Sequence, residues 1–281
     1  MAEHIKFDAW LRALAKNSNN SFVRNSENTI QQLFELDRSL PSRYGWLATS
    51  VEALGKQLEG AKSGEEVNKI YWQDMAHNIE AYEVMVLWRG TELMTAALHS
   101  LNPHEILAPA VLSRSLLELA AASIANSNII QNTIENVIAA SMSRAGLHTC
   151  GQLEALLLQI IHGTRISEPP EHIKQKNILT YIEKVSKHPD GKDLRIVYDI
   201  LCDFAHPNLL GNARFWAATL QKMKDDSSMV IMDRHAESVV TTETYSLILW
   251  ALGWSSSCIR TSHILGQKAV QAILKRWPES I

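Results

Sequence analysis

Apolar side chains recur three and four positions apart along most of this chain, which is the spacing of amphipathic α-helices. Prolines, glycines and short polar links separate the helical patterns. The predicted helices cover about residues 3–16, 27–40, 44–58, 65–101, 103–125, 128–144, 153–162, 171–187, 192–205 and 237–277. Helical and strand patterns do not alternate, so a parallel sheet is not expected. The pattern therefore predicts an all-α fold, with long antiparallel helices in a multi-helix bundle.

Residues 209–235 depart from the helical spacing. Two apolar stretches, residues 215–223 and 229–233, flank a polar turn at residues 225–228. Apolar stretches on both sides of such a turn are typical of a β-hairpin. The sequence thus allows one short β-hairpin near residues 213–234.

A break rich in small residues, at residues 60–64, indicates where the chain divides. We predict N-terminal accessory helices in residues 1–63 and a helical bundle core domain in residues 64–281.

Of the 281 residues, 46% are hydrophobic and 20% are charged, which is enough apolar material to bury a large core. The eight tryptophans favour contacts in the core or between subunits over stacking on a ligand.

Charge and cysteine usage limit the function classes. The net charge of −3 gives no general attraction to nucleic acid or to an anionic membrane. Cys150, Cys202 and Cys258 are far apart and form no C-x-x-C pair, which argues against a disulfide framework or a zinc site. The first ten residues carry acidic side chains, unlike a signal peptide, and the longest uninterrupted apolar runs are shorter than a bilayer span. We therefore expect a cytoplasmic protein without membrane or metal partners.

Several well-known catalytic motifs are missing from the sequence. It has no phosphate-binding glycine loop, no H-E-x-x-H zinc motif, no Glu-x-x-His pair and no G-x-S-x-G turn. The sequence accordingly implies no cofactor.

Charged residues in two otherwise apolar helices are the first candidate site. Arg114 and Glu118 lie four residues apart, so they share a helix face, and the residues around them are apolar or small. Residues 65–101 should form the antiparallel neighbour, and counting from the turn at Asn102 places Glu92 near Arg114 and Arg89 near Glu118. Because burying an unpaired ion is costly, we predict a buried crossed cluster that pairs Arg114 with Glu92 and Glu118 with Arg89. Such a cluster is interpreted as an ion-pair network that fixes helix register or as a polar ligand pocket; an exposed helix face is the third alternative.

A histidine at a predicted helix end is the second candidate. Tyr198, Cys202 and His206 are spaced by four and share a face, Asp203 lies close to that face, and a proline directly after His206 ends the helix. The helix dipole favours the cationic form of a histidine at this end. His206 could therefore act as a general acid or contact a phosphate, or it could simply cap the helix. A nucleophilic pair of Cys202 with His206 also fits the spacing, although buried helical cysteines usually serve packing.

Two motifs carry a resemblance to a known family. The R-x-L-L-E stretch from Arg114 to Glu118, and the Y-x-x-L-x-x-x-x-H-P stretch that begins at Tyr198, resemble an uncharacterised family of bacterial all-helical proteins. The resemblance covers about residues 80–211. That family is distantly similar to HEPN domains, helical bundles that often form homodimers and include metal-independent ribonucleases of toxin–antitoxin and antiviral defence systems. The HEPN nuclease motif is an arginine followed by four to six residues and then a histidine on one helix, whereas residues 199–202 here, which precede His206, contain no arginine.

The resemblance implies a bacterial defence setting and leaves two functions open. The first is a non-catalytic helical binding or regulatory protein, which the missing arginine favours. The alternative is a HEPN-like ribonuclease in which Arg114 holds a phosphate and His206 is the acid or base. Expected partners are a second copy or another protein, with RNA as the alternative. The candidate catalytic residues are Arg114, Glu118 and His206, and the candidate ligand-binding residues are Arg89, Glu92, Tyr198, Asp203 and Asn208.

Overall fold

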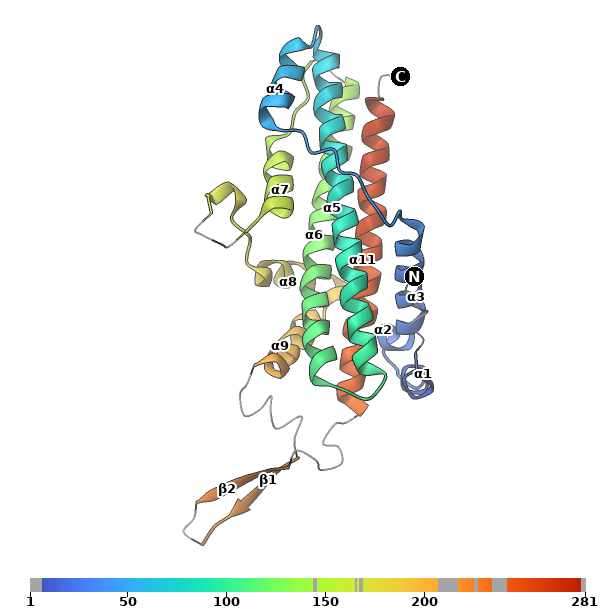
Figure 1. Ribbon diagram of the computed structural model, residues 1–281, viewed down its shortest axis with the longest axis vertical. Coiled ribbons are helices and arrows are strands. Elements are labelled where there is room, and N and C mark those ends of the chain that lie inside the picture. The colour runs from blue at the N-terminus through green and yellow to red at the C-terminus, as the bar shows by residue number, and fades with distance from the viewer. Residues whose placement is uncertain are drawn as a thin grey trace. The chain divides into compact units, whose positions relative to one another are not determined.

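The computed structural model describes residues 7–143, 146–164, 166, 169–206, 217–224, 227–233 and 242–278. Within them the fold is all-α with one short antiparallel hairpin, as the sequence pattern predicts. The first helices are α1 (Ala9–Lys16), α2 (Ser21–Arg24), α3 (Ser26–Ser39), α4 (Val51–Gly60), α5 (Gly64–Leu101) and α6 (Leu107–Ser143). They are followed by α7 (Gly151–His162), α8 (Ile178–Ser186), α9 (Leu194–Ala205) and α11 (Thr242–Arg276), with short 3-10 turns at Glu171–Ile173 and Pro189–Gly191 (Figure 1).

The hairpin lies inside the predicted region. Strand β1 (Ala217–Lys222) pairs antiparallel with β2 (Ser228–Asp233), and Leu220 is opposite Val230. The Met223 N–H donates to the Ser227 carbonyl next to the paired ends of the strands, and the prediction of a hairpin near residues 213–234 is confirmed.

The chain divides into two compact units, and each is assembled from three separate segments. Unit 1 contains Met1–Leu36, Arg89–Ala121 and Ile182–Cys258, and unit 2 contains Asp37–Trp88, Ala122–Tyr181 and Ile259–Ile281. The three longest helices, α5, α6 and α11, therefore contribute residues to both units. The predicted boundary between residues 1–63 and 64–281 stays a prediction.

Each unit has its own apolar core. In unit 1, buried side chains come from α1, α3, the second part of α5, the first part of α6, α9 and α11, and they include Leu11, Leu33, Met94, Leu116, Leu201 and Leu252. In unit 2, the segments of α5, α6 and α11 lie side by side and bury Trp72, Ile79, Leu87, Ile130, Ile134 and Ile273 (Figure 1).

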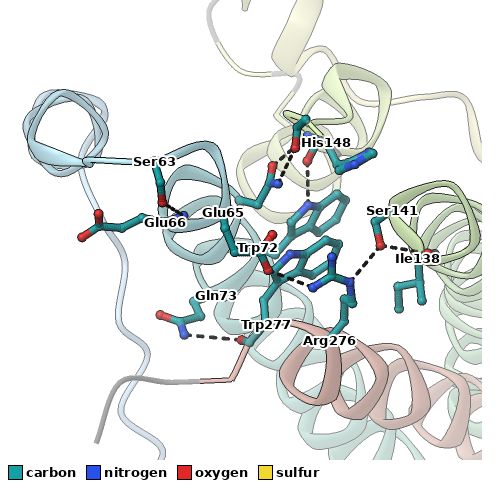
Figure 2. A network of polar contacts seen from close by, with 12 residues as sticks. Ser63, Glu65, Glu66, Trp72, Gln73, Ile138, Ser141, His148, Arg276 and Trp277 are labelled. Carbon is teal, nitrogen blue, oxygen red and sulfur yellow. Dashed lines mark hydrogen bonds and ion pairs between the residues drawn. The ribbon is translucent and has the colours of Figure 1, made fainter. Parts of the chain in front are cut away.

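The end of α11 is fixed inside unit 2 by an aromatic and polar network (Figure 2). The Trp277 ring stacks on Trp72, with ring centroids 5.3 Å apart and an interplanar angle of 9°. Arg276 donates to Glu65 and to Ser141, with distances of 2.8 and 3.0 Å. Trp277 is 1% exposed, so the last turn of α11 contributes to the core of this unit.

Two predicted helices turn out to be one. Residues 103–125 and 128–144 were predicted to be separate because polar residues interrupt the apolar pattern between them, but α6 is continuous from Leu107 to Ser143. Asn126 and Ser127, at that interruption, are buried and hydrogen-bonded to other helices. The helix also starts later than predicted, because α5 ends in a turn in which His104 has a φ of 67° and the Glu105 N–H bonds back to the Ser100 carbonyl.

Residues 44–50 are not helical, contrary to the prediction of a helix over residues 44–58. Tyr44 donates to Glu80 at 3.0 Å, and Trp46 donates to Asn78 at 3.2 Å, so this segment is bound to α5 by aromatic side chains. Helix α4 begins only at Val51, where the Ser50 hydroxyl accepts the N–H of Ala53. The helix predicted over residues 171–187 is likewise shorter, since α8 covers only Ile178–Ser186.

One helix is long and apolar enough to cross a membrane by length and composition alone. It is the Leu107–Met142 part of α6, which contains Arg114 and Glu118. Of the residues in the most apolar part of this helix, 44% are buried inside the protein. A long apolar helix in the core of a globular domain has the same length and composition. This is a weak indication, and the absence of a membrane partner stays a prediction.

Candidate functional site

Arg114, Glu118 and Tyr198 meet in unit 1 and form what we call the α6–α9 cluster. The Arg114 Nε–H donates to Glu118 Oε1 at 3.2 Å, because residues four apart on α6 lie on one face. The Tyr198 hydroxyl donates to the same carboxylate oxygen at 2.9 Å. The Arg114 guanidinium also lies 5.8 Å from the centre of the Tyr198 ring, within the range of a cation–π contact. The cluster therefore joins α6 to α9 through one shared carboxylate oxygen.

The α6–α9 cluster is half-buried. The side chains of Arg114 and Glu118 are 30% and 29% exposed, whereas Tyr198 is buried. The prediction that this pair is enclosed in the core is therefore wrong, and so is the alternative of a freely solvated helix face. An ion pair in this position keeps part of its hydration and remains accessible to a ligand or partner.

Burial and neighbouring groups together set the ionisation of this cluster. Burial and the hydrogen bond to Glu118 raise the pKa of the Tyr198 hydroxyl, so it stays protonated and continues to donate. Burial lowers the pKa of the Arg114 guanidinium, but the combined effect of Tyr198, Cys202 and Glu118 is larger and raises it. Burial raises the pKa of the Cys202 thiol, which disfavours the thiolate that a nucleophilic Cys202–His206 pair would need.

Arg89 and Glu92 do not belong to the α6–α9 cluster. Both side chains lie at exposed positions of α5, and Glu118 accepts from Arg114 and Tyr198 instead. The predicted crossed pairing is wrong because counting residues from a turn gives a height along the helix and leaves the direction of each side chain undetermined. The exposed face of α5 carries Arg89 and Glu92, where charged groups need no partner.

His206 is the C-cap residue of α9, and its backbone N–H donates to the Cys202 carbonyl at 3.0 Å. Its side chain is exposed, and the polar contacts of the α6–α9 cluster, among the residues that the structure describes, do not include it. Asp203 is partly exposed on the same helix. Asn208 lies outside the described residues. The structure thus brings together three of the eight candidate residues, Arg114, Glu118 and Tyr198.

Exposed apolar side chains extend the face of α6 that carries the cluster. Leu107 is 53% exposed and Val111 is 37% exposed, and both lie on the helical face of Arg114 and Glu118 because of their spacing. On α9 a second arginine, Arg195, is paired with Asp199 at 2.8 Å and with Glu183 at 3.6 Å. We call this surface, made of Leu107, Val111, Arg114, Glu118 and the adjacent part of α9, the α6–α9 face.

A second polar group, in unit 2, was missed by the sequence argument. Glu83 is 1% exposed and is hydrogen-bonded to Ser127 and Ser262. The available signal was a glutamate between tyrosine and valine on α5, whereas Ser127 and Ser262 have polar neighbours in the sequence and gave no such signal. Ser127 fell at the predicted break between two helices.

Within the described parts of the chain, no group of three or more His, Cys, Asp or Glu side chains could hold a metal ion. Comparison with known proteins adds no relative: no family model matches the chain, and no similar curated protein or solved structure was found.

Proposed function

We propose that this chain is a non-catalytic helical binding or regulatory protein of a bacterial defence or toxin–antitoxin system, and that the α6–α9 face binds a protein partner. The observation that carries the proposal is the half-buried, charge-balanced α6–α9 cluster beside exposed Leu107 and Val111. The defence setting rests on the resemblance of the two sequence motifs.

The composition of the α6–α9 face suits a protein surface. Arginine and tyrosine are enriched among the residues that dominate protein–protein binding, and exposed aliphatic side chains beside them supply apolar area. The Arg114 guanidinium is already oriented by Glu118 and by the Tyr198 ring, so little side-chain freedom is lost on binding.

The charge pattern is less suited to RNA. Arg114 is paired with Glu118, and Arg195 is paired with both Asp199 and Glu183. A phosphate that approaches either arginine would meet these carboxylates, whereas nucleic-acid surfaces present cations that can replace counterions. This balance favours a protein partner over a nucleic acid.

The test compares two matched substitutions of exposed valines on helices. Val111→Glu places a charge on the α6–α9 face, and Val51→Glu does the same on α4, where Val51 is 85% exposed. Tagged wild type and both variants are used to capture proteins from the native host, and each captured protein is then purified and tested for binary binding. A second copy of this chain is examined in the same way by measuring oligomeric state.

We expect a partner that binds wild type and Val51→Glu and binds Val111→Glu at least about tenfold more weakly, because a buried unpaired carboxylate costs more than about 1.4 kcal/mol. Partners that bind all three forms equally would contradict the proposed face.

The alternative is the metal-independent ribonuclease, and one observation favours it: His206 is exposed at the end of the helix that carries Tyr198. Pure wild-type protein, His206→Ala and the control His99→Ala, another exposed histidine, are incubated with RNA in EDTA. Our proposal expects no degradation by any of the three. Degradation by wild type and His99→Ala but not by His206→Ala would establish the nuclease instead.

A further inference from the structure

Three oxygen-bearing side chains from three helices form a closed ring in unit 2. The Ser127 hydroxyl of α6 lies 2.7 Å from Glu83 Oε1 of α5, and the Ser262 hydroxyl of α11 lies 3.3 Å from Glu83 Oε2. The two hydroxyl oxygens are 2.6 Å from each other, and either can be the donor. All three side chains are buried.

The ring needs three protons. Each of its three oxygen–oxygen contacts is a hydrogen bond only if one proton lies in it, and each serine supplies one. With Glu83 ionised, two protons serve three contacts, so one pair of oxygens would face each other without a proton. A proton on Glu83 completes the ring: Glu83 donates to Ser262, Ser262 donates to Ser127, and Ser127 donates to the other carboxyl oxygen.

The surroundings of Glu83 also favour the neutral form. A Cβ atom on Gly266 would overlap the Glu83 side chain, so α11 lies directly against the carboxyl group. The nearby titratable or charged groups are Glu80 and Tyr82 on α5, Arg260, His263 and the exposed Lys268 on α11, and Tyr181 on α8, which interacts with Tyr82. Helix α6 has none within a turn of Ser127. The Tyr82 hydroxyl would become negative on ionisation, so it offers Glu83 no opposite charge. The carboxyl group whose charge affects the pKa of His263 is that of Glu80. A buried carboxylate without a paired cation is strongly disfavoured.

We propose that Glu83 is a buried proton-binding site: its neutral carboxylic acid closes the Ser127–Ser262 ring, and loss of its proton loosens the packing of α5, α6 and α11 within unit 2. This site is independent of the α6–α9 face and of its proposed partner.

The direction of the pH effect follows from burial. Desolvation raises the pKa of the Glu83 carboxyl from 4.5 to about 7, and the hydrogen bonds from Ser127 and Ser262 oppose that rise. Because this pKa is higher in the folded protein, the folded protein binds the proton more tightly than the unfolded chain does. The stabilisation from the neutral acid is thus complete below about pH 4.5, and it is lost progressively as the pH rises through about 7.

Two measurements on the full chain test the proposal. Infrared spectroscopy detects the carbonyl stretch of a protonated carboxylic acid, and thermal unfolding is followed from about pH 5 to about pH 8. The variant Glu83→Gln keeps one donor and one acceptor for the ring but has no titrating proton, and Glu92→Gln is the control at an exposed position of the same helix.

We expect an acid band in wild type and Glu92→Gln at about pH 5 that is absent from Glu83→Gln and fades as the pH rises. The wild-type Tm should fall by about 5 °C or more relative to that of Glu83→Gln over this range. Parallel Tm changes in wild type and Glu83→Gln, or a wild type without the acid band, would overturn the proposal.

If Glu83→Gln does not fold, the wild-type band is assigned with Ser127→Ala and Ser262→Ala instead. Each removes two of the three hydrogen bonds of the ring, one to Glu83 and one to the other serine, and should shift the band if Glu83 carries the proton. A band that neither variant shifts would also overturn it.

Discussion

At the scale of single residues, two glutamates of this protein show how surroundings decide what a carboxyl group can do. Glu118 is partly exposed, has a guanidinium beside it and accepts two hydrogen bonds. Glu83 is buried and hydrogen-bonded to two neutral hydroxyls. The first is suited to contact a partner, and the second is suited to hold a proton.

Gly266 is the residue on which the packing around Glu83 depends. An alanine methyl group at this position would overlap the Glu83 side chain, which is held in place by both serines. We expect Gly266→Ala to destabilise the protein by roughly 1–3 kcal/mol in chemical denaturation, even though alanine has the higher helix propensity.

The matched control is Gly55→Ala in α4, where a Cβ atom meets nothing within 4 Å. That change should stabilise the helix by up to about 1 kcal/mol. If Gly266→Ala is stabilising to the same degree, the contact between α11 and Glu83 is not as close as described.

Part of the candidate site was predictable from individual residues. The Arg114–Glu118 pair follows from a spacing of four on a helix, which is a local property of the sequence. That Tyr198 joins the pair, and that Arg89 and Glu92 do not, depends on which helix faces meet. The sequence pattern indicates apolar faces but leaves their rotation about the helix axis open.

At the scale of elements, the helices were predicted well where the apolar spacing is regular and poorly where side chains bond across elements. The ends of α7 and α9 agree with the prediction to within about two residues. Asn126 and Ser127 were taken as a break between helices, although buried partners satisfy them in the middle of α6. Residues 44–50 were assigned to a helix, although bonds from Tyr44 and Trp46 to α5 hold them in another conformation.

The last turn of α11 gives a prediction at this scale. Trp277 stacks on Trp72 and on the Arg276 guanidinium, and the Gln73 amide donates to its carbonyl (Figure 2). Trp277→Ala removes a fully buried ring, so we expect a loss of about 3–5 kcal/mol in unfolding free energy. Hydrogen exchange should show faster opening in residues 259–276.

Trp277→Phe serves as the comparison, because it keeps an aromatic ring for Trp72 and should cost less than half as much as Trp277→Ala. Equal losses for both variants would mean that stacking does not hold this end of the helix.

At the scale of the whole molecule, neither compact unit is a continuous piece of chain. The chain passes from one unit to the other after Leu36, Trp88, Ala121, Tyr181 and Cys258. Regular apolar spacing predicts an all-α fold because the spacing that marks each helix lies within a short stretch of sequence. The division into units depends instead on contacts between segments that are far apart in the sequence.

The interleaving of segments also decides how the functional proposals have to be tested. Removing residues 1–63 would take Met1–Leu36 from unit 1 and the first part of Asp37–Trp88 from unit 2. Buried side chains such as Leu11, Ile30 and Leu33 would be lost, and the apolar surfaces they cover would meet water. Loss of binding or of pH response in such a fragment would report unfolding and would say nothing about the α6–α9 face or Glu83. Point substitutions in the full chain, each compared with a matched exposed site, separate these effects because they leave both cores complete.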